Sequence, residues 1–172
     1  MNEWGPQTYG DPCSGCGFNW QASPPTIGPI IDTAAVEFDS LVAGRTGFER
    51  MPSLAWSVRA YVWHAGDNLR IWAERLVAAA SGGIHPVPGY DQDQLAEARG
   101  YDSMPVGAAL WSLARATGDW HEASVMIGDR GDVAFEHPAM GSYTVADVAR
   151  QVAHDLFHHL DDVRRILLHH DP

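Results

Sequence analysis

The C-terminal segment from about residue 145 to residue 167 carries an apolar stripe that predicts a long amphipathic helix. The stripe consists of apolar residues spaced three or four apart, namely Val145, Val148, Val152, Leu156, Leu160, Val163 and Leu167. This spacing follows the period of an α-helix that buries one face. A helix of this kind must pack its apolar face on other elements, so the segment favours a layered helical fold.

Three further segments repeat the helical period, and strand-like alternation is weak everywhere. They run from about 27 to 43, from about 53 to 80 and from about 103 to 127. The last helix is expected to begin at Thr144, because Thr144 and Asp147 have the spacing of a capping box with Asp in place of Glu. We therefore predict an all-α, up-and-down four-helix bundle with long connecting loops at 81–102 and 128–143. Neither loop contains a convincing helix pattern.

The chain divides into an N-terminal arm, residues 1–25, and a helical bundle, residues 26–172. The arm is rich in Gly, Pro and Ser and contains the run Cys13-Ser14-Gly15-Cys16. A length of 172 residues with 45% apolar residues fits a single core of ordinary size.

Composition restricts the possible partners of this chain. It contains 22 acidic and 11 basic residues, none of them lysine, and its formal net charge is −11. A surface that binds nucleic acid or an anionic membrane needs a basic face, so we expect neither partner. There is no membrane-spanning run and no secretion signal, and two cysteines make no disulfide framework. We expect a cytoplasmic monomer or homodimer that acts on a small-molecule substrate.

Three histidines and three aspartates crowd the predicted last helix, and a helical wheel separates them by face. His159 lies within roughly 40° of the centre of the apolar stripe and Asp155 within roughly 80°, at about 100° per residue. Because Asp155 and His159 are four residues apart, they stack one turn apart and can bind one ion. His154 and His158 have the same spacing but fall on nearly the opposite face, so we expect them to face solvent. The inward pair would share its metal with His64.

The second predicted helix resembles that of the DinB-like four-helix bundles. The matching residues are Trp56-Ser57, Tyr61, His64, Asp67, Leu69-Arg70 and Glu74-Arg75-Leu76. This superfamily includes mycothiol-dependent maleylpyruvate isomerase and bacillithiol or mycothiol S-transferases. The resemblance covers roughly residues 26–168 and implies that His64 binds a metal together with Asp155 and His159. It also places Asp162 three residues after the second ligand of the last helix, as is common in the family. Some members open with a similar Cys-x-x-Cys-Gly-Phe arm.

Two imidazoles and one carboxylate suit zinc best, with nickel or iron as alternatives, and they leave positions open for water. Asp67 and Asp162 could accept hydrogen bonds that orient the ligand imidazoles. The resemblance implies metal-dependent thiol S-transfer or thiol-assisted isomerisation of a small electrophile, with mycothiol or another low-molecular-weight thiol as cofactor. The alternatives are a metal-assisted hydrolase or isomerase without a thiol, and a non-catalytic metal-binding stress protein.

Cys13 and Cys16 form half of a zinc site, and zinc normally needs four protein ligands when it is structural. The site could be completed by His85, His169 or His170, or across a dimer. The two thiols could instead be a redox pair, or lie unreactive in a tight Gly-rich turn. We expect them to lie outside the main catalytic site.

Five further residues are candidates for binding substrate or cofactor. Arg70 could pair with a carboxylate of either molecule, as could Arg75 or Arg115. Trp111 and Trp120 could line a pocket, although tryptophans in helical patterns more often pack within the core.

Overall fold

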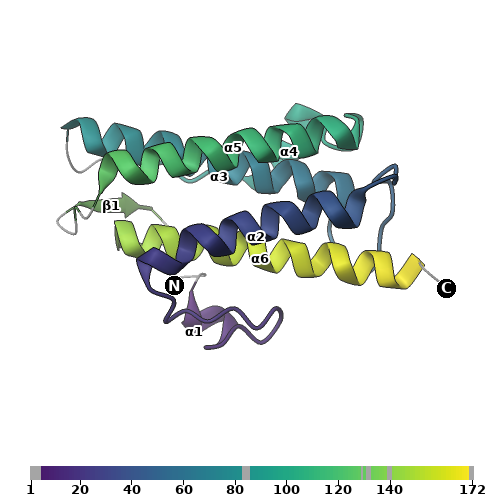
Figure 1. Cartoon of the computed structure of the whole chain (residues 1–172), viewed down its shortest axis with the longest axis horizontal. Coiled ribbons are helices and arrows are strands. Elements are labelled where there is room, and N and C mark those ends of the chain that lie inside the picture. The colour runs from purple at the N-terminus through teal and green to yellow at the C-terminus, as the bar shows by residue number, and fades with distance from the viewer. Residues whose placement is uncertain (1–4, 83–85, 129, 131–132, 139–140, 171–172) are drawn as a thin grey trace.

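Four long helices form a bundle in the computed structural model (Figure 1). They are α2 (Pro24–Val42), α3 (Val58–Gly82), α5 (Val106–Ile127) and α6 (Val145–His170). Shorter elements are α1 (Pro6–Tyr9), α4 (Gln92–Arg99) and the antiparallel hairpin of β1 (Ala134–His137) and β2 (Gly141–Thr144). The structure describes all residues except 1–4, 83–85, 129, 131–132, 139–140 and 171–172. The expected all-α four-helix bundle is confirmed. Within the described residues, no helix is both long and apolar enough to cross a membrane.

The up-and-down order expected from the sequence is not observed, because α3 and α5 run in parallel. Arg59, near the start of α3, donates a hydrogen bond of 3.2 Å to the carbonyl oxygen of Met104, which lies just before α5. Gly66 lies against the middle of α5, where an added Cβ would be 3.2 Å from Leu113 Cα. Within the 83–105 connection, the described residues 86–105 therefore return along the bundle before α5 begins, as a long crossover connection does.

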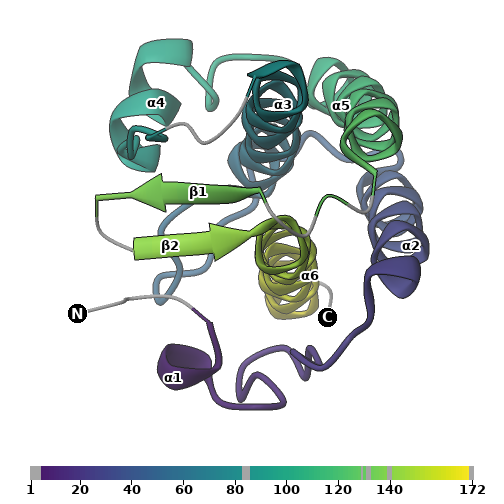
Figure 2. The same ribbon diagram turned by 90° about the vertical axis from the view of Figure 1, so that its left-hand side faces the viewer.

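The other two long helices also run in parallel with each other. Arg150 of α6 donates a hydrogen bond of 3.0 Å to the carbonyl oxygen of Ala22, just before α2. Farther along both helices, Arg164 forms a salt bridge of 2.5 Å with Glu37. Viewed end-on, α6 lies between α2 and α3, with the hairpin and α4 beside α3 (Figure 2). This arrangement sets one face of α6 directly against α3.

Two connections contain short elements that the sequence did not predict. The eight-residue helix α4 begins after Asp91, whose carboxylate accepts backbone N–H bonds of 3.0 Å from Asp93 and Gln94. It ends at Gly100, whose φ of 63° is in the left-handed region. Each strand of the hairpin has only four residues, too few to show a clear alternation.

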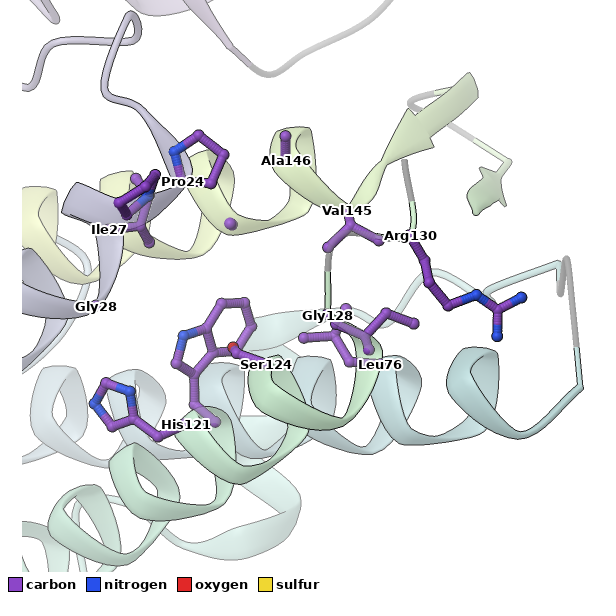
Figure 3. Close-up of a pocket in the computed structure, with 14 residues that line it drawn as sticks. Pro24, Ile27, Gly28, Leu76, His121, Ser124, Gly128, Arg130, Val145 and Ala146 are labelled. Atoms are coloured by element: carbon purple, nitrogen blue, oxygen red, sulfur yellow. The ribbon is translucent and has the colours of Figure 1, made fainter. Parts of the chain in front are cut away.

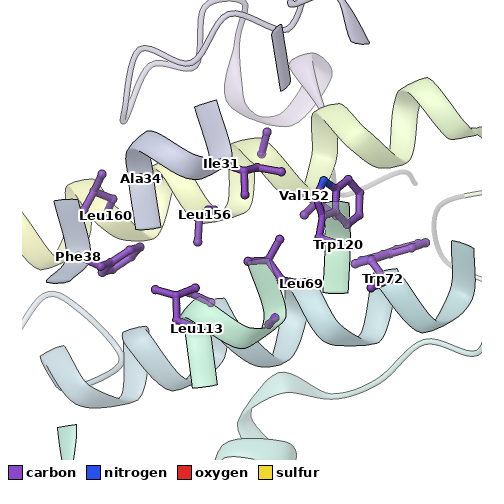
Figure 4. Close-up of a cluster of buried hydrophobic side chains, with 14 of the residues drawn as sticks. Ile31, Ala34, Phe38, Leu69, Trp72, Leu113, Trp120, Val152, Leu156 and Leu160 are labelled. Atoms are coloured by element: carbon purple, nitrogen blue, oxygen red, sulfur yellow. The ribbon is translucent and has the colours of Figure 1, made fainter. Parts of the chain in front are cut away.

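The apolar stripe of α6 is buried in the core, as expected from the sequence. Val152, Leu156 and Leu160 point between the helices, toward Ile31 and Phe38 of α2 (Figure 4). The capping box is also confirmed, because Thr144 and Asp147 exchange hydrogen bonds from backbone N–H to side-chain oxygen of 3.0 and 3.2 Å.

The N-terminal arm covers a second face of α6. Figure 2 places α1 and the loop that follows it below α6, on the side away from α5. Cys13, Phe18 and Trp20 are buried there and belong to the same apolar cluster as the bundle core. Because the arm shields this face, α6 is covered on two sides.

Candidate metal centre

His64, Asp155 and His159 meet between α3 and α6. His64 Nε2 lies 3.3 Å from Asp155 Oδ2, and His159 Nε2 lies 3.6 Å from Asp155 Oδ1. One possible ligand atom from each residue lies within 4.8 Å of the other two. The structure therefore brings together the three residues that the sequence predicts as ligands, while their binding of an ion stays a prediction.

The buried imidazole of His64 fits a cation. Its side chain is 1% exposed, and neither ring nitrogen makes a hydrogen bond to a described residue. A buried polar group without a partner is costly, on the order of 1–3 kcal/mol. An ion bound between His64 and the adjacent carboxylate would remove part of this cost.

Asp162 contacts the second imidazole, while its role in orienting a metal ligand stays a prediction. His159 Nδ1 lies 3.1 Å from Asp162 Oδ2, at hydrogen-bond distance. When Nδ1 carries the proton and donates it to Asp162, the lone pair of Nε2 faces Asp155 and is available to a metal. Arg165 approaches the other oxygen of Asp162 at 3.5 Å and balances part of its charge.

Replacing Asp162 with asparagine should weaken metal binding by about 10–100-fold, the usual effect of losing a carboxylate that orients a ligand histidine. The asparagine keeps the size of the side chain but lacks the charge that favours the Nδ1–H form of His159. The matched control is Asp161→Asn, which makes the same change one position earlier on α6 and should leave the affinity of the site between α3 and α6 unchanged. Competition with a chromophoric chelator measures both affinities. Equal affinities for the two variants would contradict the role given to Asp162.

Two residues that sequence reasoning missed hold the carboxylate of Asp155. Asn68 donates an N–H bond of 2.7 Å from Nδ2 to Asp155 Oδ2. The hydroxyl of Tyr90 donates a bond of 3.2 Å to Asn68 Oδ1, which fixes the orientation of the amide. Asn68 lies four residues after His64 on α3, and this spacing could have indicated it. Tyr90 lies in the 83–105 connection, where the sequence carries no such signal.

Neighbouring groups shift the pKa values of the two candidate ligands on α6 in opposite directions. Burial acts to raise the pKa of Asp155, but His159 and His64 outweigh it and hold that pKa well below its usual range. Burial acts to lower the pKa of His159, but Asp155 and Asp162 outweigh it and raise that pKa to about 9. Two carboxylates thus surround one imidazole, and their negative potential suits a cation.

Asp67 does not orient a ligand imidazole as expected. It is buried, accepts a hydrogen bond of 2.5 Å from the hydroxyl of Tyr101, and forms ion pairs with Arg70 and Arg99. Arg70 also donates a bond of 3.3 Å to Ser112. These contacts join α3 to the 83–105 connection and to α5, so Asp67 and Arg70 support the fold beside the site.

The structure separates the two tryptophans that were expected to line a pocket. Trp111 is 69% exposed on α5. Trp120 is buried and lines a cavity of about 490 Å³ between α2, α5 and the start of α6. Figure 3 shows this cavity with Ile27 and His121 at its wall. His64, Asp155 and His159 do not line it. Trp120 therefore lines a cavity separate from the candidate metal centre.

The expectation that His154 and His158 face solvent is wrong. His154 is 2% exposed and His158 is half-buried, because the N-terminal arm covers this face of α6. The helical wheel correctly separated His154 and His158 from the core-facing stripe. However, no pattern within α6 indicates that the arm packs on their face. Both histidines meet Cys13 and Cys16, whose possible ligand atoms lie within 4.8 Å of theirs and of each other.

Other suggested partners of the two cysteines are not at this cluster. His169 and His170 are exposed at the end of α6, where His170 Nε2 lies 2.7 Å from the carbonyl oxygen of Arg50. His85 lies outside the described residues. Burial raises the pKa of the Cys16 thiol to about 12, which argues against a reactive redox pair.

Comparison with known proteins supports the fold. No family model matches the chain, and no curated protein matches it. Among solved structures, it is similar to YfiT from Bacillus subtilis, described as a probable metal-dependent hydrolase with an unusual four-helix bundle topology. The two are 16% identical, the match covers 87% of this chain and 90% of YfiT, and the TM-score is 0.77. At this identity the likeness establishes a shared four-helix bundle.

Proposed function

We propose that this chain is a metal-dependent enzyme in which His64, Asp155 and His159 hold one divalent ion, with zinc the best match to the donor set. The observation that carries the proposal is the buried imidazole of His64, which makes no hydrogen bond to a described residue and faces a carboxylate and a second imidazole on the neighbouring helix. YfiT, which has the same fold, is described as a probable metal-dependent hydrolase.

Three protein ligands and partial exposure favour catalysis over a structural role. Closed structural zinc sites have four protein ligands, whereas catalytic sites keep a position open. Asp155 and His159 are 21% and 15% exposed, so small molecules can approach the ligands from one side. A divalent ion with an open position lowers the pKa of a bound water or thiol, which supplies hydroxide or thiolate near neutral pH.

The residues around the ligands have positioning roles in this proposal. Asp162 holds His159, and Tyr90 acts through Asn68 to hold Asp155. Aromatic rings cover the imidazoles, with Trp56 centred 4.8 Å from His64 and Tyr61 centred 5.0 Å from His159. These rings exclude water from the inner side and leave an apolar wall for a small electrophilic substrate.

We propose water as the nucleophile, and therefore hydrolysis, as the first candidate reaction. An anionic thiol cofactor would need a cation close to the ligands. Three arginines beside the site already have acidic partners, because Arg165 pairs with Asp162, and Arg70 and Arg99 pair with Asp67. A fourth, Arg75, donates to the carbonyl oxygen of Pro88 and lies over the ring of Trp72. Thiol S-transfer or thiol-assisted isomerisation, with mycothiol or a related thiol, is the second candidate and rests on the DinB-like sequence resemblance. A cytoplasmic location belongs to the same proposal, since the two free cysteines suit a reducing compartment.

The test uses the full chain loaded with zinc, nickel or iron, and measures turnover of small activated esters and amides. A parallel set of reactions contains small electrophiles and mycothiol, with thiol adducts detected by mass spectrometry. We expect hydrolysis that stops on chelation and returns when the metal is restored. Adduct formation without hydrolysis would replace the first candidate with the second. Metal binding without turnover in either set would instead support a non-catalytic metal-binding protein.

A further inference from the structure

We propose that Cys13, Cys16, His154 and His158 form a second metal site, a closed structural zinc site that fastens the N-terminal arm to α6. Two residues come from the arm and two from the helix, and their possible ligand atoms all lie within 4.8 Å of one another. Neither the fold comparison nor the proposed catalytic centre accounts for this cluster.

The donor set and its spacing match a zinc site. The cysteines are separated by two residues and the histidines by three, within the ranges found in Cys₂His₂ sites. Tetrahedral zinc with the usual Zn–S and Zn–N bond lengths places neighbouring ligand atoms about 3.3–3.8 Å apart. Cys13 Sγ lies 3.6 Å from His158 Nδ1, within that interval. Small side-chain movements would bring the remaining atoms to the same separation.

The backbone of the arm is folded to present both sulfurs to α6. Cys13 N–H donates a bond of 2.8 Å to the carbonyl oxygen of Phe18, and Gly17 N–H donates one of 2.8 Å to that of Cys13. Gly17 has a φ of 78°, which favours glycine in this tight turn. Gly15 lies against the ring of His158, where an added Cβ would be only 2.8 Å from Cε1. The residues between and after the cysteines thus permit the close approach.

Aromatic side chains close the site around a buried histidine. The ring centroids of Trp20, Tyr9 and Phe18 lie 4.3, 4.7 and 5.5 Å from that of His154. The Nε2 atom of His154 is buried and makes no hydrogen bond to a described residue. Four protein ligands in an apolar enclosure leave no open coordination position, so this site is suited to holding the arm and not to catalysis.

Helix α6 would then carry two ligand pairs on neighbouring faces. His154 and His158 face the arm, while Asp155 and His159 face α3. The two pairs are offset by one residue, which is a rotation of about 100° around the helix. The arm site can therefore be emptied without altering any ligand of the catalytic centre.

The test is the metal content and cobalt spectrum of the full, tag-free chain purified under reducing conditions. We expect two metal ions per chain, and one ion in both the Cys13→Ser/Cys16→Ser variant and the His158→Ala variant. The matched control, His159→Ala, should also hold one ion, but at the arm. After cobalt substitution, a thiolate-to-cobalt charge-transfer band should appear in the wild type and in His159→Ala and be absent from the cysteine variant.

The cobalt spectrum of the wild type keeps the proposal testable even if a variant fails to fold. Absence of the charge-transfer band from folded, reduced wild-type protein would overturn it. So would a Cys13–Cys16 disulfide in protein prepared under reducing conditions, detected by mass spectrometry. Retention of two ions by the cysteine variant would exclude the sulfurs as ligands. A wild-type chain that holds a single ion and shows the charge-transfer band would refute the catalytic centre while leaving the arm site supported.

Discussion

Replacing His159 with alanine is expected to remove the ion bound between α3 and α6. The variant loses one of two imidazoles and leaves the carboxylates of Asp155 and Asp162 without the ring that lies between them. Loss of a residue that merely orients a ligand costs about 10–100-fold in affinity, so loss of the ligand itself should cost at least about 100-fold. Elemental analysis after dialysis against a weak chelator measures the effect.

Stability provides a second measurement of the same change. An ion at a free concentration 100 times its dissociation constant stabilises the folded state by about 2.7 kcal/mol. Binding of the ion between α3 and α6 should therefore raise the Tm of the wild type, and this rise should be absent from His159→Ala. The control is His121→Ala, since His121 is a surface residue paired with Asp32 at 2.7 Å and belongs to neither cluster. If His159→Ala kept its metal between α3 and α6, the ligand set proposed here would be wrong.

The sequence predicted the contacts that depend on regular helix geometry. The apolar stripe determined which face of α6 meets α3, and the four-residue spacing set Asp155 and His159 one turn apart. His64 could be added from the family resemblance because its neighbours on the second helix match the DinB-like pattern. The geometry of these three residues requires only that two long helices pack side by side.

Contacts made by the irregular segments could not be predicted in this way. The arm lies more than 100 residues before His154 in the chain, and no periodic pattern within the arm indicates where it packs. One signal was available, because the spacings of Cys13 with Cys16 and of His154 with His158 together match a zinc site. The helical wheel instead predicted that His154 and His158 face solvent, because a wheel treats every face away from the core stripe as exposed.

The environment of Asp67 illustrates the same limit. From the sequence, Asp67 was expected to accept a hydrogen bond that orients a ligand imidazole. Tyr101 and Arg99 instead reach it from the 83–105 connection, at 2.5 and 2.9 Å. The connection that makes α3 and α5 parallel brings these partners to Asp67. No spacing of residues within α3 indicates the course of that connection.

Replacing Trp20 with alanine should destabilise the protein by about 3 kcal/mol, at the low end of the range for replacing a buried aromatic side chain with alanine. Trp20 is 5% exposed and packs between the arm and His154. Its indole N–H is buried and makes no hydrogen bond to a described residue, so removing it also relieves an unfavourable contribution. Urea denaturation of the metal-free protein measures the change in the free energy of unfolding.

Trp111→Ala is the matched control, because it deletes the same side chain from an exposed position on α5 and should change stability by at most about 0.5 kcal/mol.

Comparing the two variants without metal separates apolar packing of the arm from any contribution of zinc. A loss near 3 kcal/mol for Trp20→Ala in metal-free protein would mean that packing alone holds the arm on α6. A difference below about 1 kcal/mol would show that the arm is not part of the core. In the first case the cysteines and histidines are held together before any ion arrives, and such preorganisation favours tight binding.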